Sequence, residues 1–396
     1  MSKKKILIVY PYVFRDFDYL RYEIKNLEKN FGAEVIIHEL IRIIHPKFIN
    51  AYSNFCNSQK ITRFETYSIW QKEFRHLVDK NPDLLIIKDI QSSNFLSFLI
   101  NLEIKKSKKK VLEYSGSQGH PPDLELNLKN LNFSSLLNIK KISFFLNTKI
   151  FNILGNLFEL YPNHCLKAGT KGFKKNYKSS KVNIIKANTF DYSNYITYRT
   201  KKKKSKKKII IYLDSPSPLY HGDRLLVGNN KEDFFTIKNW YKSLNIFFRN
   251  IEKLLDIKVK ISLHPKVDTH DARCKYKNIF EGRKILKKRP LYYLDNTKLI
   301  ISRDSTALSY AVIFKIPSMV ITSNELMQHN KFINYQKFLA KELGVDIFNI
   351  DDNFEIKKII NLIKINKKKY YQYRTKYLTS LNILKPNYKL IGETFL

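Results

Sequence analysis

The chain has 396 residues, of which 43% are hydrophobic, and it carries 72 Lys and Arg residues against 35 Asp and Glu residues. This length predicts two domains, and the hydrophobic fraction excludes wholesale disorder. The net charge of +37 favours phosphate-rich partners, but lysine and asparagine abound throughout, which is typical of compositional drift rather than of a local binding device. Three widely separated cysteines form no metal or redox spacing and indicate a reduced, cytoplasmic chain.

The first half alternates apolar strands with amphipathic helices and has no hairpin turns. This order predicts a parallel sheet with helices on both faces. Strands are expected at 6–10, 35–37, 84–87, 111–114 and 182–187, and helices at 17–31, around 70–78, at 94–104 and within 124–160.

Candidate catalytic groups of this half follow the expected strands. Ligands of open parallel sheets bind at the carboxyl ends of strands, and a glycine-rich loop follows the strand at 111–114. It is either a ligand-binding loop or a plain connection. The candidates are Ser115, Gly116, Ser117 and Gly119 as loop residues, with His120, Asp16 or Asp18 as the catalytic base.

A lysine-rich run at 201–208 separates the two halves. No aromatic residue is interleaved with it, so we expect a solvated linker and no nucleic-acid partner. The predicted organisation is a first domain at 1–195, a linker at 196–208 and a second domain at 209–396, whose last helices cross back to the first. Strands are expected at 209–213, 259–263, 299–301 and 318–322, and helices at 237–254, 338–343, 356–365 and 370–381.

The strand at 259–263 runs directly into His264-Pro265-Lys266. An imidazole and an ammonium group at the carboxyl end of a buried strand can neutralise a diphosphate or another anionic leaving group. The alternative is a buried histidine that is satisfied by the backbone. Polar loops after neighbouring strands add further candidates for donor binding, namely Asp214, His221, Asp223 and Glu325.

The apolar run at 299–301 leads into Ser302-Arg303-Asp304-Ser305-Thr306, and a helix is expected to start at Ser305 or Thr306. The exposed N–H groups at a helix start can bind a phosphate. The simpler interpretation is an ordinary helix cap, because Ser, Thr and Asp favour that position anyway. A second candidate anion-binding element, at His264, favours the interpretation of this segment as a phosphate-binding site.

These residues resemble motifs of the GT-B superfamily, which comprises two-Rossmann-domain glycosyltransferases and sugar-nucleotide epimerases. More narrowly, the chain is similar to bacterial surface-polysaccharide (capsule or lipopolysaccharide) biosynthesis proteins. The resemblance is carried by 191–195, 212–214, 221–223, 262–266 and 302–307, whereas the first domain matches only in its strand–helix order.

The His-Pro and Ser/Thr elements are also similar to those of bacterial sialyltransferases and polysialyltransferases. That resemblance implies that His264 contacts the donor phosphate and that Ser305 and Thr306 contact the phosphate or nucleotide. The acidic motif that supplies the general base of those enzymes is not found in this chain.

The resemblance implies an α/β fold in which two Rossmann-like, doubly wound parallel-sheet domains face a cleft. The expected function is metal-independent glycosyl transfer, without a cofactor, from a nucleotide-sugar donor to a glycan or lipid-linked acceptor. The chain is expected in the cytoplasm, with an anionic inner-membrane surface as a further partner. The alternatives are a sugar-nucleotide 2-epimerase, which needs an acidic pair, and a non-enzymatic basic adaptor.

Overall fold

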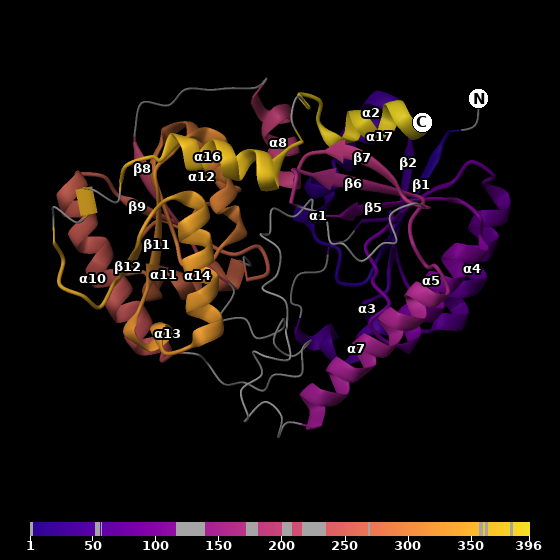
Figure 1. The fold of residues 1–396 in the computed structure, drawn as a ribbon, viewed down its shortest axis with the longest axis horizontal. Helices are drawn as coiled ribbons and strands as arrows, with labels where there is room; N and C mark the ends of the chain where they lie inside the picture. Colours follow the sequence, from indigo (N-terminus) through magenta and orange to yellow (C-terminus); the bar gives the residue numbers. More distant parts are fainter. Residues whose placement is uncertain are drawn as a thin grey trace.

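The computed structural model contains two parallel sheets that lie side by side, each with helices on both faces (Figure 1). The predicted two-domain α/β architecture is therefore confirmed. The structure describes residues 3–51, 56, 58–115, 139–171, 181–199, 208–215, 235–267, 270–355, 359–360, 363–380 and 383–396.

The first sheet has seven strands in the order β3-β2-β1-β4-β5-β6-β7, and all its pairings are parallel. The strand order reverses between β1 and β4, which is where open parallel sheets bind ligands. The strands are β1 (Lys5–Tyr10), β2 (Glu34–Glu39), β3 (Ile61–Arg63), β4 (Leu85–Lys88), β5 (Lys110–Ser115), β6 (His164–Ala168) and β7 (Asn183–Ala187).

Helices cover both faces of this sheet. One apolar cluster joins one face to α1, α2 and α17, and another joins the opposite face to α3, α4 and α5. The helices of the first half are α1 (Asp16–Arg21), α2 (Ile24–Phe31), α3 (Ile41–Ile44), α4 (Tyr67–Lys80), α5 (Phe95–Lys106), α7 (Ile139–Leu157) and α8 (Phe190–Arg199), with a 3₁₀ turn, η1 (Pro46–Ala51).

The second sheet has the order β12-β11-β10-β8-β9, again with parallel pairings only. Its strand order reverses between β8 and β10. The strands are β8 (Ile209–Leu213), β9 (Val259–Ser262), β10 (Thr297–Ser302), β11 (Ser318–Thr322) and β12 (Ile347–Asn349). The helices are α10 (Ile237–Leu255), α11 (His270–Ile279), α12 (Ser309–Phe314), α13 (Asn324–Met327), α14 (Asn330–Leu343), α16 (Lys367–Tyr373) and α17 (Asn387–Phe395), with 3₁₀ turns η4 (Pro290–Asn296) and η5 (Thr306–Leu308) and a π-helical turn, η6 (Arg374–Leu378).

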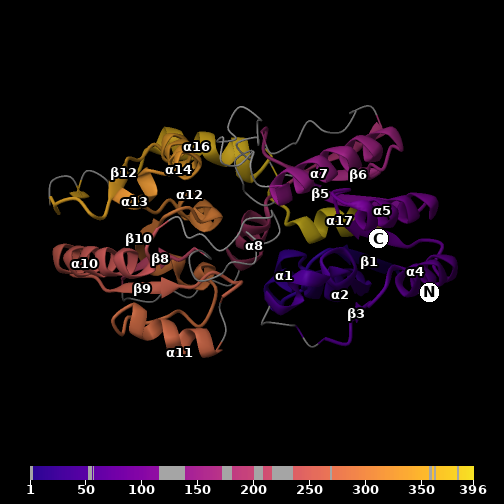
Figure 2. The same ribbon diagram turned by 90° about the horizontal axis from the view of Figure 1, so that it is seen from below.

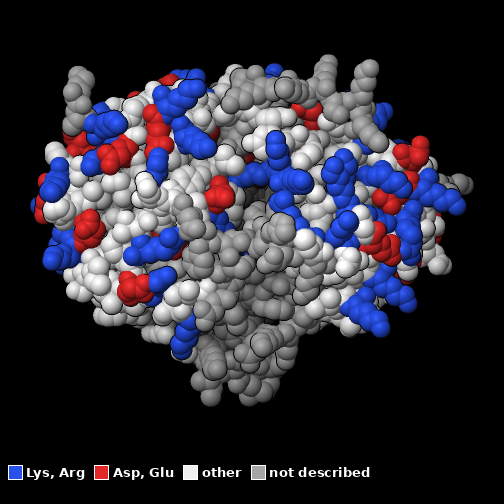
Figure 3. Space-filling view, turned by 180° about the vertical axis from the view of Figure 1, so that it is seen from behind, with Lys and Arg blue, Asp and Glu red and all other residues white. Residues whose placement is uncertain are grey.

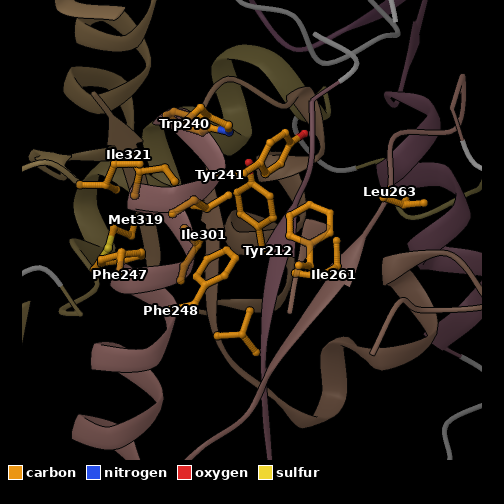
Figure 4. Close-up of a cluster of buried hydrophobic side chains, with 14 of the residues drawn as sticks. Tyr212, Trp240, Tyr241, Phe247, Phe248, Ile261, Leu263, Ile301, Met319 and Ile321 are labelled. Carbon is orange, nitrogen blue, oxygen red and sulfur yellow. The ribbon is translucent and has the colours of Figure 1, made fainter. Parts of the chain in front are cut away.

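Apolar clusters cover both faces of the second sheet, and one of them lies between the sheet and α10. Aromatic residues of the helix, Trp240, Phe247 and Phe248, pack against Tyr212 and Ile301 of the central strands (Figure 4). The rings of Tyr212 and Phe248 have centroids 5.2 Å apart. This cluster fixes the strands whose carboxyl ends carry the candidate site.

The expected single helix at 17–31 is wrong, because the structure breaks it into α1 and α2 at Tyr22 and Glu23. Glu23 has a left-handed backbone with φ 50°. Its carboxylate accepts hydrogen bonds from Ser193 Oγ at 2.7 Å and from the Tyr388 N–H at 3.1 Å. Contacts with distant parts of the chain therefore override a regular helical period.

Two helices connect the domains. α8 contacts α1 of the first domain and α12 of the second, and it contains residues 196–199 of the expected linker. The chain then returns, and α17 packs against α2 of the first domain, as both ribbon views show (Figures 1 and 2). None of the described helices has the length and apolarity needed to cross a bilayer.

Gly169 lies where the returning chain contacts the end of β6. We expect Gly169→Ala to lower the free energy of unfolding by about 3 kcal/mol. Its φ is +66°, and an added Cβ would overlap the backbone carbonyl oxygen of Lys376. Gly32→Ala is the matched control, because Gly32 has φ +64° but no atom within 4 Å of the added Cβ. For the control we expect a loss of about 1 kcal/mol in the free energy of unfolding, measured in urea. Equal losses of unfolding free energy in the two variants would show that overlap with the Lys376 carbonyl oxygen does not add to the destabilisation.

Candidate functional site

The candidate site begins where three adjacent strands of the second sheet end. β8 lies between β9 and β10, so His264, Asp214 and Ser302 follow one another along one sheet edge. Hydrogen bonds tie these ends together. The Asp214 N–H donates to the Ser262 carbonyl at 2.9 Å, and Ser302 Oγ donates to the Leu213 carbonyl at 3.1 Å. The edge is thus a rigid platform for a ligand.

His264 has one ring nitrogen engaged by the backbone. Its Nδ1 accepts a hydrogen bond from the Lys266 N–H at 3.2 Å, so a neutral ring carries its proton on Nε2. Burial and the positive charges of Lys266, Arg15 and Arg21 lower the pKa of His264 to about 3. At neutral pH the side chain is therefore an uncharged hydrogen-bond donor, rather than a charged imidazolium.

Cationic groups from the first domain lie near His264. Arg15 precedes α1 and Arg21 ends it, and both act electrostatically on His264 across the domain boundary. Arg289 of the second domain donates a hydrogen bond to the Phe17 carbonyl and so joins the two domains. In the space-filling view, Lys and Arg side chains lie along one side of a hollow near the middle of the molecule, and an acidic side chain lies on its other side (Figure 3). The arrangement suits a ligand with negative charge.

The segment Ser302 to Thr306 leads into a helical segment that begins with a 3₁₀ turn. Thr306–Leu308 is a 3₁₀ turn, and the α-helix α12 begins only at Ser309 and has six residues. Ser302 is fully buried, and its Oγ accepts from the Ser305 N–H at 3.1 Å, while Ser305 Oγ accepts from the Ala307 N–H at 3.3 Å. The helical segment therefore starts at Thr306 with Ser305 as its N-cap, as expected, but its first turn is 3₁₀ and the hydroxyls serve as ordinary caps.

Arg303 and Asp304 bind within the protein. Arg303 is 1% exposed, and its guanidinium lies 5.0 to 5.5 Å from the ring centroids of Phe235, Phe332 and Trp240. The Asp304 carboxylate accepts hydrogen bonds from Ser215 Oγ and, at 3.4 Å, from Arg303 Nε. These two residues support the ends of β8 and β10.

Asp214 is a buried carboxyl group at the end of β8. It is 4% exposed, and burial, the largest effect, raises its pKa to about 7 although Arg303 acts in the opposite direction. Within the described part of the chain, its Oδ2 has no hydrogen-bond partner. Asp214 can therefore change protonation near neutral pH at the edge of the site.

Glu325 caps another helix instead of standing free. Its carboxylate accepts hydrogen bonds from the Thr236 N–H and, at 3.0 Å, from Asn239 Nδ2 at the start of α10. These bonds, with that of Asn239 the strongest influence, lower its pKa. Glu325 also lines an open cavity of about 590 Å³ together with Lys238 and His329.

The two first-domain acids proposed as bases differ in exposure. Asp16 is exposed, whereas Asp18 is fully buried. Asp18 lies 3.7 Å from an Arg21 guanidinium nitrogen and accepts the Arg15 N–H at 3.0 Å. Burial raises the pKa of Asp18. Asp18 therefore caps the start of α1 at the Arg15 backbone and pairs with the Arg21 side chain.

Asp89 is a candidate that the sequence interpretation missed. It directly follows β4, beside the point where the strand order reverses. Tyr22 Oη donates to its Oδ2 at 3.1 Å, and burial followed by the charge of Glu113 raises its pKa to about 7. Glu113 lies on β5 opposite Lys88. Glu113 therefore acts electrostatically on Asp89 near the ligand-binding edge of the first sheet.

Several predicted residues lie outside the described residues, namely Gly116, Ser117, Gly119, His120, His221 and Asp223. Ser115 ends β5, and Pro265 is exposed in the turn after β9. Among the residues that the structure describes, no group of three or more His, Cys, Asp or Glu side chains is placed to hold a metal ion.

No protein-family model and no curated protein matches this sequence. Among solved structures, a variant of the wall teichoic acid polymerase TagF has a TM-score of 0.56 at 11% identity, with 100% of this chain and 89% of that chain covered. The UDP-GlcNAc 2-epimerase from Methanocaldococcus jannaschii has a TM-score of 0.51 at 15% identity, with 98% of both chains covered. These similarities show the fold, and the chain has the two-domain GT-B architecture.

Proposed function

We propose that the chain is a glycosyltransferase that moves a sugar from a nucleotide-activated donor to a surface-polysaccharide or lipid-linked glycan acceptor. The observation that carries the proposal is the position of His264. This neutral imidazole lies at a strand end of the second domain and within the field of Arg15 and Arg21 of the first. A site of this kind suits the phosphates of a nucleotide sugar, because both domains contribute to it.

The chemical step follows from these groups. The acceptor hydroxyl oxygen forms a bond to the anomeric carbon, and the bond from that carbon to the phosphate oxygen breaks with its electron pair on the phosphate. His264 Nε2–H donates a hydrogen bond to the leaving phosphate, and Lys266 and the first-domain arginines stabilise its charge. All of these are protein groups, so no step of the proposal requires a metal ion.

The proton of the acceptor hydroxyl needs a base, and we assign this role to Asp89. A general base acts best with a pKa near the working pH, and the pKa of Asp89 is raised to about 7. Asp18 is less suited, because it is fully buried and paired with Arg21. Asp89 lies at the strand-order reversal of its sheet, which is where an acceptor would meet the donor.

A thermal-shift series with UDP-, CMP- and GDP-linked sugars tests the donor class. We expect one nucleotide class to raise Tm by several degrees, because a ligand at about a hundred times its Kd stabilises a protein by about 2.7 kcal/mol. The same series with Lys266→Met should show a smaller shift. A set of nucleotides that leaves Tm unchanged at millimolar concentration would contradict the proposal.

A sugar-nucleotide 2-epimerase is the second candidate, and the electrostatic interaction between the acidic residues Asp89 and Glu113 favours it. Such an enzyme removes a proton from the sugar and returns one without an acceptor. Incubation in D₂O with the donor alone separates the candidates. Deuterium incorporation at the sugar C2 with formation of the epimer would identify the epimerase, whereas transfer that depends on an acceptor, without isotope exchange, supports the glycosyltransferase.

A further inference from the structure

The helix α7 has a stripe of exposed apolar side chains on its outer side. Leu146, Ile150, Ile153 and Leu157 are 49, 49, 57 and 73% exposed. Their spacing of four, three and four residues puts them on one side of the helix. The outer side of a helix that packs on a domain is ordinarily polar, so this contiguous stripe is a candidate interaction surface.

The opposite side of α7 already packs on the first domain. The ring of Phe151 lies 6.0 Å from that of Phe98 on α5. Gly155 is buried, and its position would bring a Cβ within 3.2 Å of Ser92 Oγ. The stripe is therefore a second apolar face, which the described residues of the domain leave exposed. Both ribbon views show α7 on the outside of the first domain, beside α5 (Figures 1 and 2).

Lysines predominate at this surface, and the exposed Glu159 just beyond α7 pairs with Lys181. The α7 segment contains three lysines, one of them the exposed Lys149, and no acidic residue. Lys105 of the adjacent α5 donates a hydrogen bond to the Phe158 carbonyl just beyond α7, and Lys106 beside it is exposed. An apolar stripe with lysines around it matches a surface that combines an apolar layer with negative charge.

We propose that α7 docks the protein onto an anionic phospholipid bilayer. The helix lies in the interface, with its stripe at the boundary between headgroups and acyl chains and its lysines at the headgroups. This inference goes beyond the proposed function, and it holds whichever reaction the cleft performs. It would bring the cleft to the surface on which a lipid-linked acceptor resides.

Cosedimentation of the full chain with vesicles of phosphatidylglycerol and phosphatidylcholine tests this docking. We expect the variant Ile150→Ser, Ile153→Ser, Leu157→Ser to bind at least about tenfold more weakly than the wild type, because each change removes exposed apolar area. The matched control changes three exposed apolar residues elsewhere, Ile246→Ser, Tyr371→Ser and Leu384→Ser, and should bind within about twofold of the wild type. Equal binding by both variants overturns the proposal.

A fluorescence measurement tests the docking of α7 without relying on the stability of the triple serine variant. Trp70 and Trp240 are 0 and 2% exposed, so a tryptophan at Ile153→Trp reports on the stripe. We expect its emission to shift to the blue and to be quenched by brominated lipid when anionic vesicles are added. An unchanged emission contradicts the docking. Self-association of the wild type that the α7 variant abolishes, without vesicle binding, would identify a second copy as the partner and would also overturn the proposal.

Discussion

His264→Ala should lower kcat for glycosyl transfer by about a hundredfold to a thousandfold, while KM for the donor changes little. The size follows from the loss of one preorganised hydrogen-bond donor to a developing negative charge, which costs this much in other enzymes. In this chain the donor is His264 Nε2–H, because Nδ1 is held by the Lys266 N–H. Initial rates at varied donor concentration would separate kcat from KM.

The control for this prediction is His164→Gln, which changes a histidine outside the cleft. His164 begins β6, and its ring lies 4.8 Å from that of Phe395 of α17. We expect its variant to keep the wild-type rate. Undiminished turnover by His264→Ala would show that the reaction does not need this imidazole and would contradict the mechanism.

Asp89→Asn should reduce kcat by about a hundredfold to ten thousandfold, because the amide cannot accept the acceptor proton. Asp83→Asn is the control, since Asp83 is exposed and precedes the other end of the same strand. A loss of the same size in both variants would point to damage of the fold rather than to lost chemistry. Thermal melting of both variants would check this.

The pH profile of the wild type gives the same assignment a second test. Asp89 acts as a base only when it is deprotonated, and its pKa is raised to about 7. The rate should therefore rise with pH up to about 7 and then level off. His264 adds no limb near neutral pH, because its pKa is lowered to about 3. Asp89→Asn should abolish the limb near pH 7, and a variant that retains this limb would exclude Asp89 as its source.

The architecture could be predicted because its central strands are unbroken apolar runs. The segments 6–10, 209–213 and 318–322 are buried on both faces in the structure, and their patterns predict them closely. The sequence does not predict β3, β6 or β12. β3 and β12 have three residues each, which is too short for a hydrophobic period, and in β6 a histidine and a lysine interrupt the apolar residues. They form because neighbouring strands already supply a template for pairing.

A site residue could be predicted from the sequence only where its position directly after an apolar strand was enough to indicate its role. His264 was found because it directly follows an apolar run. Asp89 also follows such a run, but its importance depends on the strand-order reversal, which only the folded sheet shows. The role of Arg15 could not be predicted, because it depends on how the first domain lies against the second. The hydroxyls of Ser302 and Ser305 suggested an anion site, but the turn uses them as internal caps.

The central claim is that groups from both domains bind the phosphates of one donor. Calorimetric titration of the nucleotide that raises Tm tests it most directly in two variants, Arg15→Met in the first domain and Lys266→Met in the second. We predict that each variant lowers the affinity about tenfold or more, since each removes one positive charge near the phosphates. Loss of affinity in Lys266→Met alone, with wild-type binding by Arg15→Met, would contradict a phosphate site shared between the domains.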